Sequence, residues 1–579
     1  MKIEKETEHA IVHVNGQEQI TGAEALLQCL LEEGVDTIFG YPGGAIMPVY
    51  DKLLDFTGRL NHYLTRHEQG AAHAAQAYSM VTGKPGICFA TSGPGATNLV
   101  TGIANAFLDS VPVVFITAQV TSGLIGTDAF QETDIIGVSM PVTKWNCQVK
   151  KPQDIPDTIA KAFYIAKTGR PGPVLIDITK DAQLEKLCFK YKKCDYIRSY
   201  NPLIPLHIKA IESAAIMINH AEKPLILAGH GVLLSRAEKE LKAFAEKTGI
   251  PVASTLMGLS AFPSDHRLFT GMLGMHGNYG PNLLTNEADL IIAIGMRFDD
   301  RVTGNLKKYA KKATIIHIEI DEAEINKNVL VDVEINNDAK EVLKYLIPLV
   351  KENSFEKWIR EFRICDKTEY EKVIKEETKP EEGDIKMGEV VKLVSDLTKG
   401  EAIIVTDVGQ NQMYAARYYK FSNPNSLVTS GGMGTMGFGL PAGIGAKVGR
   451  PDKPVIAFLG DGGFQMTIQE LGTILQYKVP LKIIILNNNY LGMVRQWQDM
   501  FFNKRYASTE LVNPDFVMIA KAFGIPGKKV VIRKELKTAL DEMMAAKGPY
   551  LLDVIVEKEG NVFPMVEPGS SVSEVRLTY

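Results

Sequence analysis

The sequence lacks any run of 18 consecutive apolar residues, so we expect no transmembrane helix. A formal net charge of only −4 over 579 residues gives no basic surface of the kind that binds nucleic acid. The amino terminus has neither the apolar core of a signal peptide nor the Arg/Ser-rich composition of a transit peptide. The six cysteines include no CxxC pair and mostly lie in apolar surroundings, which predicts reduced thiols in a cytoplasmic protein.

The composition is that of a globular protein, with 45% hydrophobic and 23% charged residues. A chain of 579 residues is too long for one hydrophobic core and indicates about three domains. Two charged segments, 186–206 and 351–386, are predicted to be linkers, and the second is expected to be helical and exposed. We therefore predict an extension at 1–19, domains at 20–190, 206–348 and 388–560, and a tail at 561–579.

Short apolar runs alternate with helical patterns in all three blocks, which predicts an α/β fold with parallel sheets. The first helix is expected at 23–33. The strands are expected at 37–40, 87–90, 111–118 and 174–178, at 224–228, 251–254, 290–294 and 314–320, and at 402–406, 455–459, 482–486 and 550–556.

The most informative stretch covers residues 455–493. An apolar strand ends in Gly460-Asp461-Gly462-Gly463, a helical pattern follows over 464–476, and a second strand ends in Asn487-Asn488-Asn489. Open α/β sheets bind ligands at the carboxyl ends of their strands, where these side chains stand. Asp461 and Asn488 offer hard oxygens suited to Mg²⁺, and the glycines would let backbone N–H groups approach a diphosphate. A Gly-rich turn and a polar strand end are also common in Rossmann-like folds that hold no metal.

The Gly-Asp-Gly and Asn-Asn pairs, with residues 463–486 between them, resemble the thiamine diphosphate motif. The resemblance implies that Asp461, Asn488 and the main-chain carbonyl of Tyr490, where relatives often carry Glu, hold Mg²⁺. It also implies three doubly wound parallel-sheet domains, as in the pyruvate oxidase and decarboxylase group. Their roles would be pyrimidine binding, FAD binding in the middle domain, and diphosphate binding.

Glu68 lies in the segment Arg-His-Glu-Gln-Gly-Ala-Ala-His. Taken alone, it would be a surface glutamate stabilised by a helix start. The resemblance makes it the catalytic glutamate that favours the imino tautomer of the cofactor's aminopyrimidine. The remaining contacts to this cofactor would come from Gln410, Asn411 (where relatives usually have His), Gly434, Met436, Gly462, Gly463 and Met493.

Three further stretches, 126–134, 296–304 and 491–498, resemble the acetohydroxyacid synthase (acetolactate synthase) family. Two departures are Met296, where Ala is usual, and Thr121, where Pro is frequent. Gln131 and Lys180 would line the catalytic site, and Phe130, Arg301 and Trp497 would contact substrate. Taken alone, Trp497 would be a core or interface aromatic. The implied FAD site comprises Arg170, Gly229, His230, Gly231, Thr255, Leu256, Met275, His276, Gly295, Arg297, Arg301, Val302, Glu319 and Asp338.

The resemblance extends over about residues 20–567 and implies a carboligase acting on 2-keto acids, with thiamine diphosphate, Mg²⁺ and a non-redox FAD. It also implies a homodimer or tetramer with active sites at the dimer interface, and it leaves a small regulatory subunit open. One alternative is an FAD-dependent pyruvate oxidase or another thiamine diphosphate-dependent decarboxylase. The other is a non-enzymatic cofactor-binding or scaffold protein, which would have no need of Glu68 together with Asp461 and Asn488.

Overall fold

The protein is described from a computed structural model that covers residues 13–14 and 17–579. It divides into two compact units, one of residues 1–79 and 84–201 and the other of residues 80–83 and 202–579. Most of the predicted extension at 1–19 lies outside the described residues. Its last part belongs to β2 (Gln17–Thr21), which pairs with β1 (His13–Val14) and with β9 (Lys186–Cys188) in an antiparallel sheet. The first predicted linker therefore begins as a strand.

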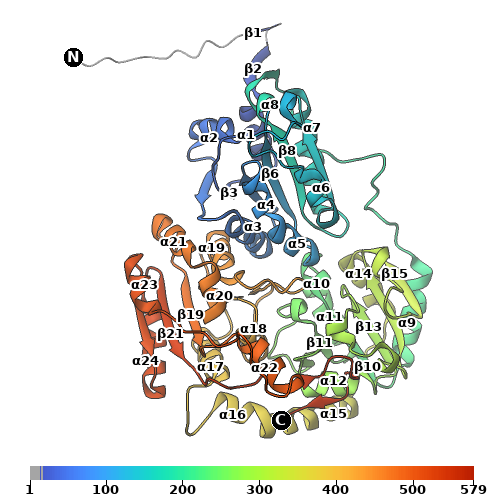
Figure 1. Ribbon diagram of the computed structural model, residues 1–579. Helices are drawn as coiled ribbons and strands as arrows, with labels where there is room; N and C mark the ends of the chain where they lie inside the picture. The colour runs from blue at the N-terminus through green and yellow to red at the C-terminus, as the bar shows by residue number, and fades with distance from the viewer. Residues whose placement is uncertain (1–12, 15–16) are drawn as a thin grey trace. The chain divides into compact units, whose positions relative to one another are not determined.

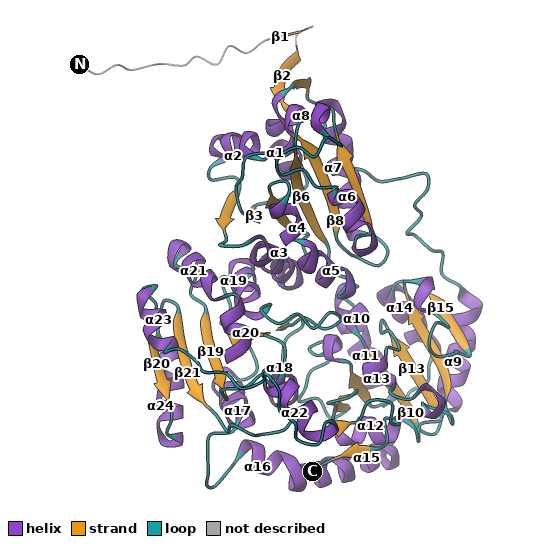
Figure 2. Ribbon diagram, viewed as in Figure 1, coloured by secondary structure: helices purple, strands orange, loops and turns teal. Residues whose placement is uncertain are grey.

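Three six-stranded parallel sheets form the framework of the two units, with helices flanking each sheet (Figures 1 and 2). This confirms the predicted α/β fold. The first unit holds the sheet β4-β3-β5-β6-β8-β7, with β3 Thr37–Gly40, β4 Asn61–Leu64, β5 Gly86–Ala90, β6 Val113–Gln119, β7 Trp145–Val149 and β8 Val174–Thr179.

The second unit holds the other two parallel sheets. The sheet β12-β11-β10-β13-β14-β15 comprises β10 Pro224–Ala228, β11 Val252–Ser254, β12 Phe269–Met272, β13 Leu290–Ile294, β14 Thr314–Glu319 and β15 Val333–Asn336. The sheet β17-β16-β18-β19-β21-β20 comprises β16 Ile403–Thr406, β17 Leu427–Val428, β18 Val455–Gly460, β19 Lys482–Asn487, β20 Gly527–Val530 and β21 Tyr550–Ile555. A short antiparallel pair, β22 (Met565–Val566) and β23 (Val575–Arg576), lies in the predicted tail.

The helices connect these strands. The first unit has α1 Gly22–Glu32, α2 Met47–Leu53, α3 Glu68–Thr82, α4 Pro94–Asn98, α5 Val100–Leu108, α6 Ile135–Ser139, α7 Ile155–Lys167 and α8 Lys180–Leu184. The second has α9 Ile208–His220, α10 His230–Leu234, α11 Glu238–Thr248, α12 Tyr279–Thr285, α13 Asp300–Thr303, α14 Ala339–Leu349, α15 Glu356–Glu369, α16 Lys375–Thr378, α17 Met387–Thr398, α18 Gln410–Tyr418, α19 Gly439–Gly449, α20 Asp461–Met466, α21 Leu471–Tyr477, α22 Gly492–Phe501, α23 Phe516–Ala522 and α24 Arg533–Ala545. Within the described residues, no helix is both long and apolar enough to cross a membrane.

Each parallel sheet has a point at which the order of its strands reverses. In the last sheet the chain passes from β16 outward to β17 and then returns to the other side of β16 through β18 and β19. The equivalent reversals lie between β3 and β5 and between β10 and β13. The connections that leave these strand pairs diverge, which opens a crevice at the carboxyl ends where doubly wound folds bind ligands.

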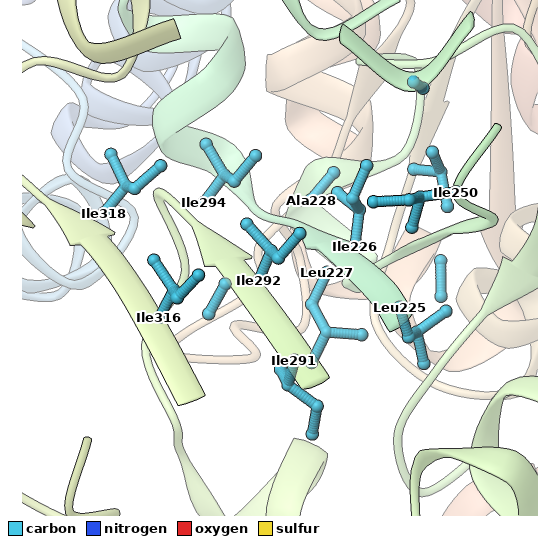
Figure 3. Packing of buried hydrophobic residues seen from close by; sticks show 14 of the residues in the cluster. Leu225, Ile226, Leu227, Ala228, Ile250, Ile291, Ile292, Ile294, Ile316 and Ile318 are labelled. Carbon is cyan, nitrogen blue, oxygen red and sulfur yellow. The ribbon is translucent and has the colours of Figure 1, made fainter. Parts of the chain in front are cut away.

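The core of the middle sheet shows why its central strands are easy to find in the sequence. Ile292 and Ile294 of β13 stand beside Ile316 and Ile318 of β14, and the whole of β10 is buried (Figure 3). Helices cover both faces of such a sheet, so the side chains of a central strand such as β13 are apolar and the strand reads as a continuous hydrophobic run.

The second predicted linker is helical but not exposed. In α15, Trp358 and Phe362 are fully buried, and Trp358 Nε1 donates to the carbonyl of Pro224 at 2.9 Å. At the end of the same helix, Glu369 forms an ion pair with Arg417 of α18, and the two side chains are 1% and 0% exposed. The prediction of exposure was wrong because the many charged residues occupy one face of the helix and hide an apolar face.

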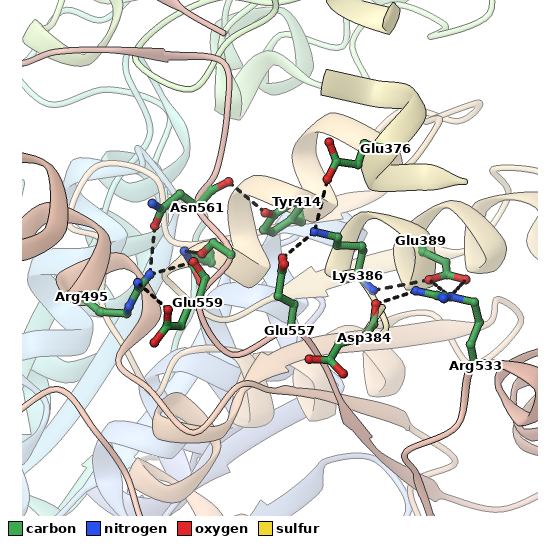
Figure 4. A network of polar contacts seen from close by, with 12 residues as sticks. Glu376, Asp384, Lys386, Glu389, Tyr414, Arg495, Arg533, Glu557, Glu559 and Asn561 are labelled. Carbon is green, nitrogen blue, oxygen red and sulfur yellow. Dashed lines mark hydrogen bonds and ion pairs between the residues drawn. The ribbon is translucent and has the colours of Figure 1, made fainter. Parts of the chain in front are cut away.

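A chain of polar contacts ties this segment to the last domain (Figure 4). Lys386 Nζ lies 2.8 Å from the carboxylate of Glu557, and Arg533 Nε lies 3.0 Å from that of Glu389. Glu377, near them on α16, has a buried Oε2 without a hydrogen-bond partner among the described residues. Burial raises the pKa of its carboxyl from 4.5 to about 7, and the nearby Lys386 lowers it only in part.

This environment predicts a pH-dependent cost at Glu377. Because the pKa is higher in the folded than in the unfolded chain, ionised Glu377 destabilises the fold fully above pH 7, and the cost vanishes below pH 4.5. Glu377→Gln should therefore raise Tm. The excess of its free energy of unfolding over that of the parent should grow by on the order of 2 kcal/mol between pH 5 and 8. The exposed Glu381→Gln is the control, and a gain that does not change with pH would contradict the assignment.

Candidate active site

The third sheet carries a pocket at its reversal point, between the ends of β16 and β18. Its walls come from the loops after β16, β18 and β19 and from the start of α22. The lining residues are Met387, Val408, Gly409, Gln410, Asn411, Met436, Gly460, Asp461, Gly462, Gly463, Leu486, Asn488, Tyr490, Leu491, Gly492, Met493 and Val494.

Asp461 is the acidic side chain of this pocket and is only 1% exposed. Burial raises the pKa of its carboxyl to about 6, although a hydrogen bond from Asn513 lowers it. Its Oδ2 accepts from Asn513 Nδ2 at 2.6 Å. A buried carboxylate held by amides and without a cationic side chain in the pocket lining is a suitable ligand for a hard cation.

Asn488 faces the same pocket from the end of β19. Its Nδ2 donates to Gln410 Oε1 at 3.2 Å, and its Oδ1 accepts from the backbone of Tyr490 at 3.2 Å. Tyr490 follows in the same loop and also lines the pocket. The structure thus brings the three predicted Mg²⁺ ligands to one place, and their oxygen chemistry fits that ion.

The glycines of the predicted phosphate site have different reasons to be glycine. A Cβ on Gly463 would lie 2.4 Å from the carboxylate of Asp407, which is fully buried and accepts from the backbone of Gly437 and Gly439. Asp407 therefore holds the Gly-rich segment against the start of α20. Gly462 lines the pocket itself.

Several residues predicted to contact the cofactor also line this pocket, but the side-chain amide of Gln410 already forms hydrogen bonds within the protein. Gln410 Nε2 donates to Gln496 Oε1 at 3.1 Å and to the carbonyl of Gly560 at 2.8 Å. Asn411 and Met436 line the pocket, while Gly434 lies in the adjacent segment with φ +66°. The amide of Gln410 therefore orients Asn488, and its role as a diphosphate donor stays a prediction.

The predicted catalytic glutamate is buried in the first unit. Glu68 begins α3, is 8% exposed and accepts from Asn98 Nδ2 at 3.0 Å. A Cβ on Gly95 would lie 3.1 Å from its Oε1, so the turn after β5 packs directly against the carboxylate. Glu68 thus stands near the reversal point of its own sheet and is not the surface residue expected from the helix start alone.

The remaining predicted residues of the first unit lie on loops or at the start of a helix. Gln131 has φ +59°, and its carbonyl would be 2.7 Å from a Cβ on Gly93, while the adjacent Phe130 is 88% exposed. Lys180 begins α8 directly after β8 and is half-buried. Arg170 Nε donates to Ser110 Oγ at 2.8 Å.

The predicted flavin glycines meet at the reversal point of the middle sheet. Gly231 N donates to the carbonyl of Gly295 at 2.8 Å, and a Cβ on Gly231 would lie 2.6 Å from Gly295 Cα. Gly229 is similarly close to Met296. The packing of the two turns is sufficient to require these glycines, so their identity alone does not establish a flavin site.

A second cluster of predicted flavin residues lies around α13. Met275 N donates to the carbonyl of Arg301 at 2.8 Å, and Arg301 Nη1 lies 3.4 Å from Met275 Sδ. Buried His276 is anchored through its carbonyl, which accepts from Arg417 Nη1 at 3.0 Å. Val302, within the four-residue helix α13, is buried.

The other predicted flavin residues have local structural roles. Thr255 Oγ1 accepts from Gly258 N at 3.0 Å, and Asp338 Oδ1 caps α14 by accepting from Lys340 N at 2.9 Å. Glu319 Oε1 accepts from the backbone of Ile320 at 2.9 Å. Arg297 pairs with Asp299 at 3.8 Å, and Leu256 packs against the core of the last domain.

Helix α22 carries the predicted substrate-facing residues. Met493 lines the pocket, and Trp497, four residues later, is half-buried with its ring 5.4 Å from that of Phe501. Gln496, three residues after Met493 on the same helix, is fully buried and exchanges hydrogen bonds with the backbone of Val562 at 2.8 and 3.2 Å. The sequence analysis assigned no supporting role to Gln496, Asn513 or Asp407, because the motifs do not mark amides and carboxylates that act through other side chains.

Three family descriptions match the chain. The thiamine pyrophosphate enzyme N-terminal TPP binding domain matches residues 20–138, the central domain matches residues 211–346, and the C-terminal TPP binding domain matches residues 407–554. The predicted boundaries at 190, 206, 348, 388 and 560 stay predictions.

The relatives cover nearly the whole chain. The protein is 44% identical to the acetolactate synthase large subunit of Haemophilus influenzae, over 97% of this chain and 98% of that protein. It is 47% identical to that of Corynebacterium glutamicum, over 96% and 90%, and 44% identical to the isozyme 2 large subunit of Escherichia coli, over 96% and 99%. With matches of this extent, the chain belongs to the acetolactate synthase large-subunit family of thiamine pyrophosphate enzymes.

Proposed function

We propose that this protein is the catalytic subunit of an acetolactate synthase. It decarboxylates pyruvate and joins the remaining two-carbon unit to a second 2-keto acid. Pyruvate as acceptor gives 2-acetolactate and 2-ketobutyrate gives 2-aceto-2-hydroxybutyrate, precursors of valine, leucine and isoleucine. The observation that carries the proposal is the pocket at the β16–β18 reversal, where Asp461 and Asn488 converge beside a Gly-rich turn.

Different residues of the chain serve Mg²⁺, thiamine diphosphate and FAD. Asp461, Asn488 and the carbonyl of Tyr490 hold Mg²⁺, which neutralises the diphosphate. When bound, thiamine diphosphate supplies the carbon nucleophile and the electron sink for decarboxylation. Glu68, oriented by Asn98, holds a proton at the aminopyrimidine ring. FAD is held by the middle domain and undergoes no net redox change.

Substrate contacts come from residues that the structure leaves accessible. The Arg301 side chain is 59% exposed, and its contacts with Met275 and with Asp300 at 3.6 Å leave donors for the acceptor carboxylate. Gln131 and Lys180 line the catalytic site, and Phe130, almost fully exposed, meets substrate in the assembled enzyme.

The enzyme assembles as a homodimer or tetramer with its active sites at the dimer interface, and it acts in the cytoplasm. Curated relatives are named large subunits, which supports a small regulatory subunit as a further partner. Size-exclusion chromatography with light scattering, with and without a co-expressed small subunit, tests both points.

Product identification tests the proposed activity. The purified protein is incubated with pyruvate and 2-ketobutyrate, with thiamine diphosphate, Mg²⁺ and FAD omitted one at a time. Acetolactate and acetohydroxybutyrate are expected only with the complete set. Acetaldehyde as the sole product would indicate a simple decarboxylase, and acetate with a bleached flavin would indicate a pyruvate oxidase.

Trp497 is expected to set the choice of acceptor. Its half-buried ring stands one helical turn beyond Met493, which lines the pocket, and we expect it to contact the extra methyl group of 2-ketobutyrate. One such contact is worth about 10- to 200-fold in discrimination. Trp497→Leu should therefore abolish most of the preference for 2-ketobutyrate and largely spare acetolactate formation. An unchanged product ratio in competition would leave Trp497 a structural residue, and joint loss of both products would also refute the specificity role.

A further inference from the structure

The loop that carries two of the proposed Mg²⁺ ligands is backed by a second segment, residues 509–513. Leu491 N donates to the carbonyl of Thr509, and Leu511 N donates to that of Asn489, both at 2.8 Å. Tyr490 and Glu510 form an antiparallel bridge between them. The backing segment thus follows the whole ligand loop and ends beside Asp461.

Asn513, at the end of this segment, joins the two strand ends that flank the pocket. Its Nδ2 donates to Asp461 Oδ2 at 2.6 Å and to Asn487 Oδ1 at 2.9 Å. Its Oδ1 accepts from Gln465 Nε2 at 2.9 Å, and the same nitrogen of Gln465 lies 3.2 Å from the main-chain oxygen of Asp461. Because Asp461 Oδ2 and Asn487 Oδ1 both accept, only the amide nitrogen of Asn513 can face them.

This arrangement occupies one of the two carboxylate oxygens of Asp461. We infer that Asn513 is a positioning residue that keeps Asp461 a one-oxygen ligand and thereby favours Mg²⁺ over a larger divalent cation. The inference rests on the proposed function, since it requires the metal site at Asp461 and Asn488. Asn513 does not line the pocket and acts only through Asp461.

The selectivity follows from coordination chemistry. Mg²⁺ requires six ligands at about 2.0–2.1 Å in near-octahedral geometry and takes carboxylates through one oxygen. Ca²⁺ accepts six to eight ligands at about 2.3–2.6 Å and commonly takes a carboxylate through both oxygens. Releasing Asp461 Oδ2 from Asn513 would let the carboxylate rotate and bind with both oxygens, which suits the larger ion.

The test measures binding of thiamine diphosphate, by calorimetry, as a function of Mg²⁺ or Ca²⁺ concentration. Loss of a partner that orients a metal ligand typically costs about 10- to 100-fold in metal affinity. Asn513→Ala should raise the half-saturating Mg²⁺ concentration by about that factor and affect Ca²⁺ much less, so the Mg²⁺/Ca²⁺ preference should fall about tenfold or more. A merely structural weakening would change both ions equally.

Asn513→Leu, with the same number of side-chain heavy atoms, is the second variant, should Asn513→Ala fold poorly. It also removes the donor and frees Asp461 Oδ2, so it should shift selectivity in the same direction. The control is Asn219→Ala in the middle domain, which loses an amide bonded to Leu349 O at 3.3 Å and Lys351 N at 2.8 Å. It should leave both metal titrations unchanged.

The outcomes separate this inference from the function on which it rests. If the parent binds thiamine diphosphate with Mg²⁺ and both Asn513 variants retain its Mg²⁺/Ca²⁺ ratio, the positioning role is refuted while the metal site stands. If the parent binds thiamine diphosphate with neither ion, the metal site itself falls, and the inference falls with it.

Discussion

Glu68→Gln is expected to reduce pyruvate turnover by about 10²- to 10⁴-fold, the usual contribution of a positioned proton-transfer group. The substitution keeps the shape of the side chain and can keep a hydrogen bond with Asn98, but it cannot hold the proton that the aminopyrimidine requires. Cofactor affinity should change little, because Glu68 belongs to the first unit and the metal ligands belong to the second. Initial rates of acetolactate formation at saturating cofactor measure the effect.

Glu33→Gln is a matched control for this substitution. Glu33 is also a buried glutamate of the first unit, with its side chain 3% exposed, and it bonds Lys167 at 3.1 Å and Tyr191 at 2.7 Å. It should leave turnover intact at temperatures where the fold is stable. Near-parental turnover by Glu68→Gln, or an equal loss in Glu33→Gln, would remove the catalytic assignment.

Mixing Glu68→Gln subunits with Asp461→Ala subunits is expected to restore activity that neither variant has alone. If each active site takes Glu68 from one chain and Asp461 from another, every hybrid dimer has one intact site and one doubly defective site. Purified hybrids of a two-fold dimer should then show about half the parental turnover. Separately tagged subunits, co-expressed and purified over both tags, provide the hybrid for assay.

The opposite arrangement gives a clear alternative result. If both residues of a site come from one chain, each site of a hybrid carries one defect, and hybrids stay as inactive as the parents. Demonstrated hybrids without recovery would therefore rule out shared sites. The double variant Glu68→Gln/Asp461→Ala mixed with unmodified chains serves as control, because its hybrids should have no intact site if sites are shared and one intact site if each site comes from one chain.

The sequence predicted the centre of every parallel sheet and missed its edges. All twelve expected strands correspond to the four central strands of the three sheets, whereas β4, β7, β12, β15, β17 and β20 were not anticipated. The central strands β5, β6 and β13 are buried along their whole length, but β4 and β7 are mostly half-exposed. A strand with one neighbour and partial solvent contact needs no continuous apolar run, so its pattern is weak.

The expected helix over 464–476 shows a similar limit. The structure divides it into α20 and α21 with a short 3₁₀ turn between them, and two apolar residues of the pattern, Met466 and Leu475, are 56% and 50% exposed. Two others, Leu471 and Ile474, are buried. Apolar spacing predicted the helical character of this segment but not its interruption.

The motif residues were predictable in type and place, since Asp461, Asn488 and Met436 meet in one pocket. Their supporting contacts were not. Asn513 comes from a segment without a motif, and Gln496 lies in the family-like stretch 491–498 without a role assigned to it. Both roles depend on which loops the fold brings together. The buried Glu369–Arg417 pair was hidden for the same reason, within a segment whose charge density indicates exposure.

For the predicted flavin residues, a role in cofactor binding is hard to separate from a role in the fold. Gly231 and Gly295 are required by the contact between two turns, and Asp338 is required as a helix cap. Each would be kept in a protein that binds no flavin. Arg301 differs, because its guanidinium is largely exposed beside Met275, and it is therefore the more informative position to substitute.

The ratio of CO₂ released to pyruvate consumed, measured without oxygen while the flavin spectrum is followed, tests the carboligase activity most directly. We predict one CO₂ for every two pyruvate molecules, with acetolactate as product, an oxidised flavin throughout, and loss of the reaction when thiamine diphosphate or Mg²⁺ is withheld. One CO₂ for every pyruvate, with the flavin reduced in step with turnover, would contradict the proposed function and identify an oxidase.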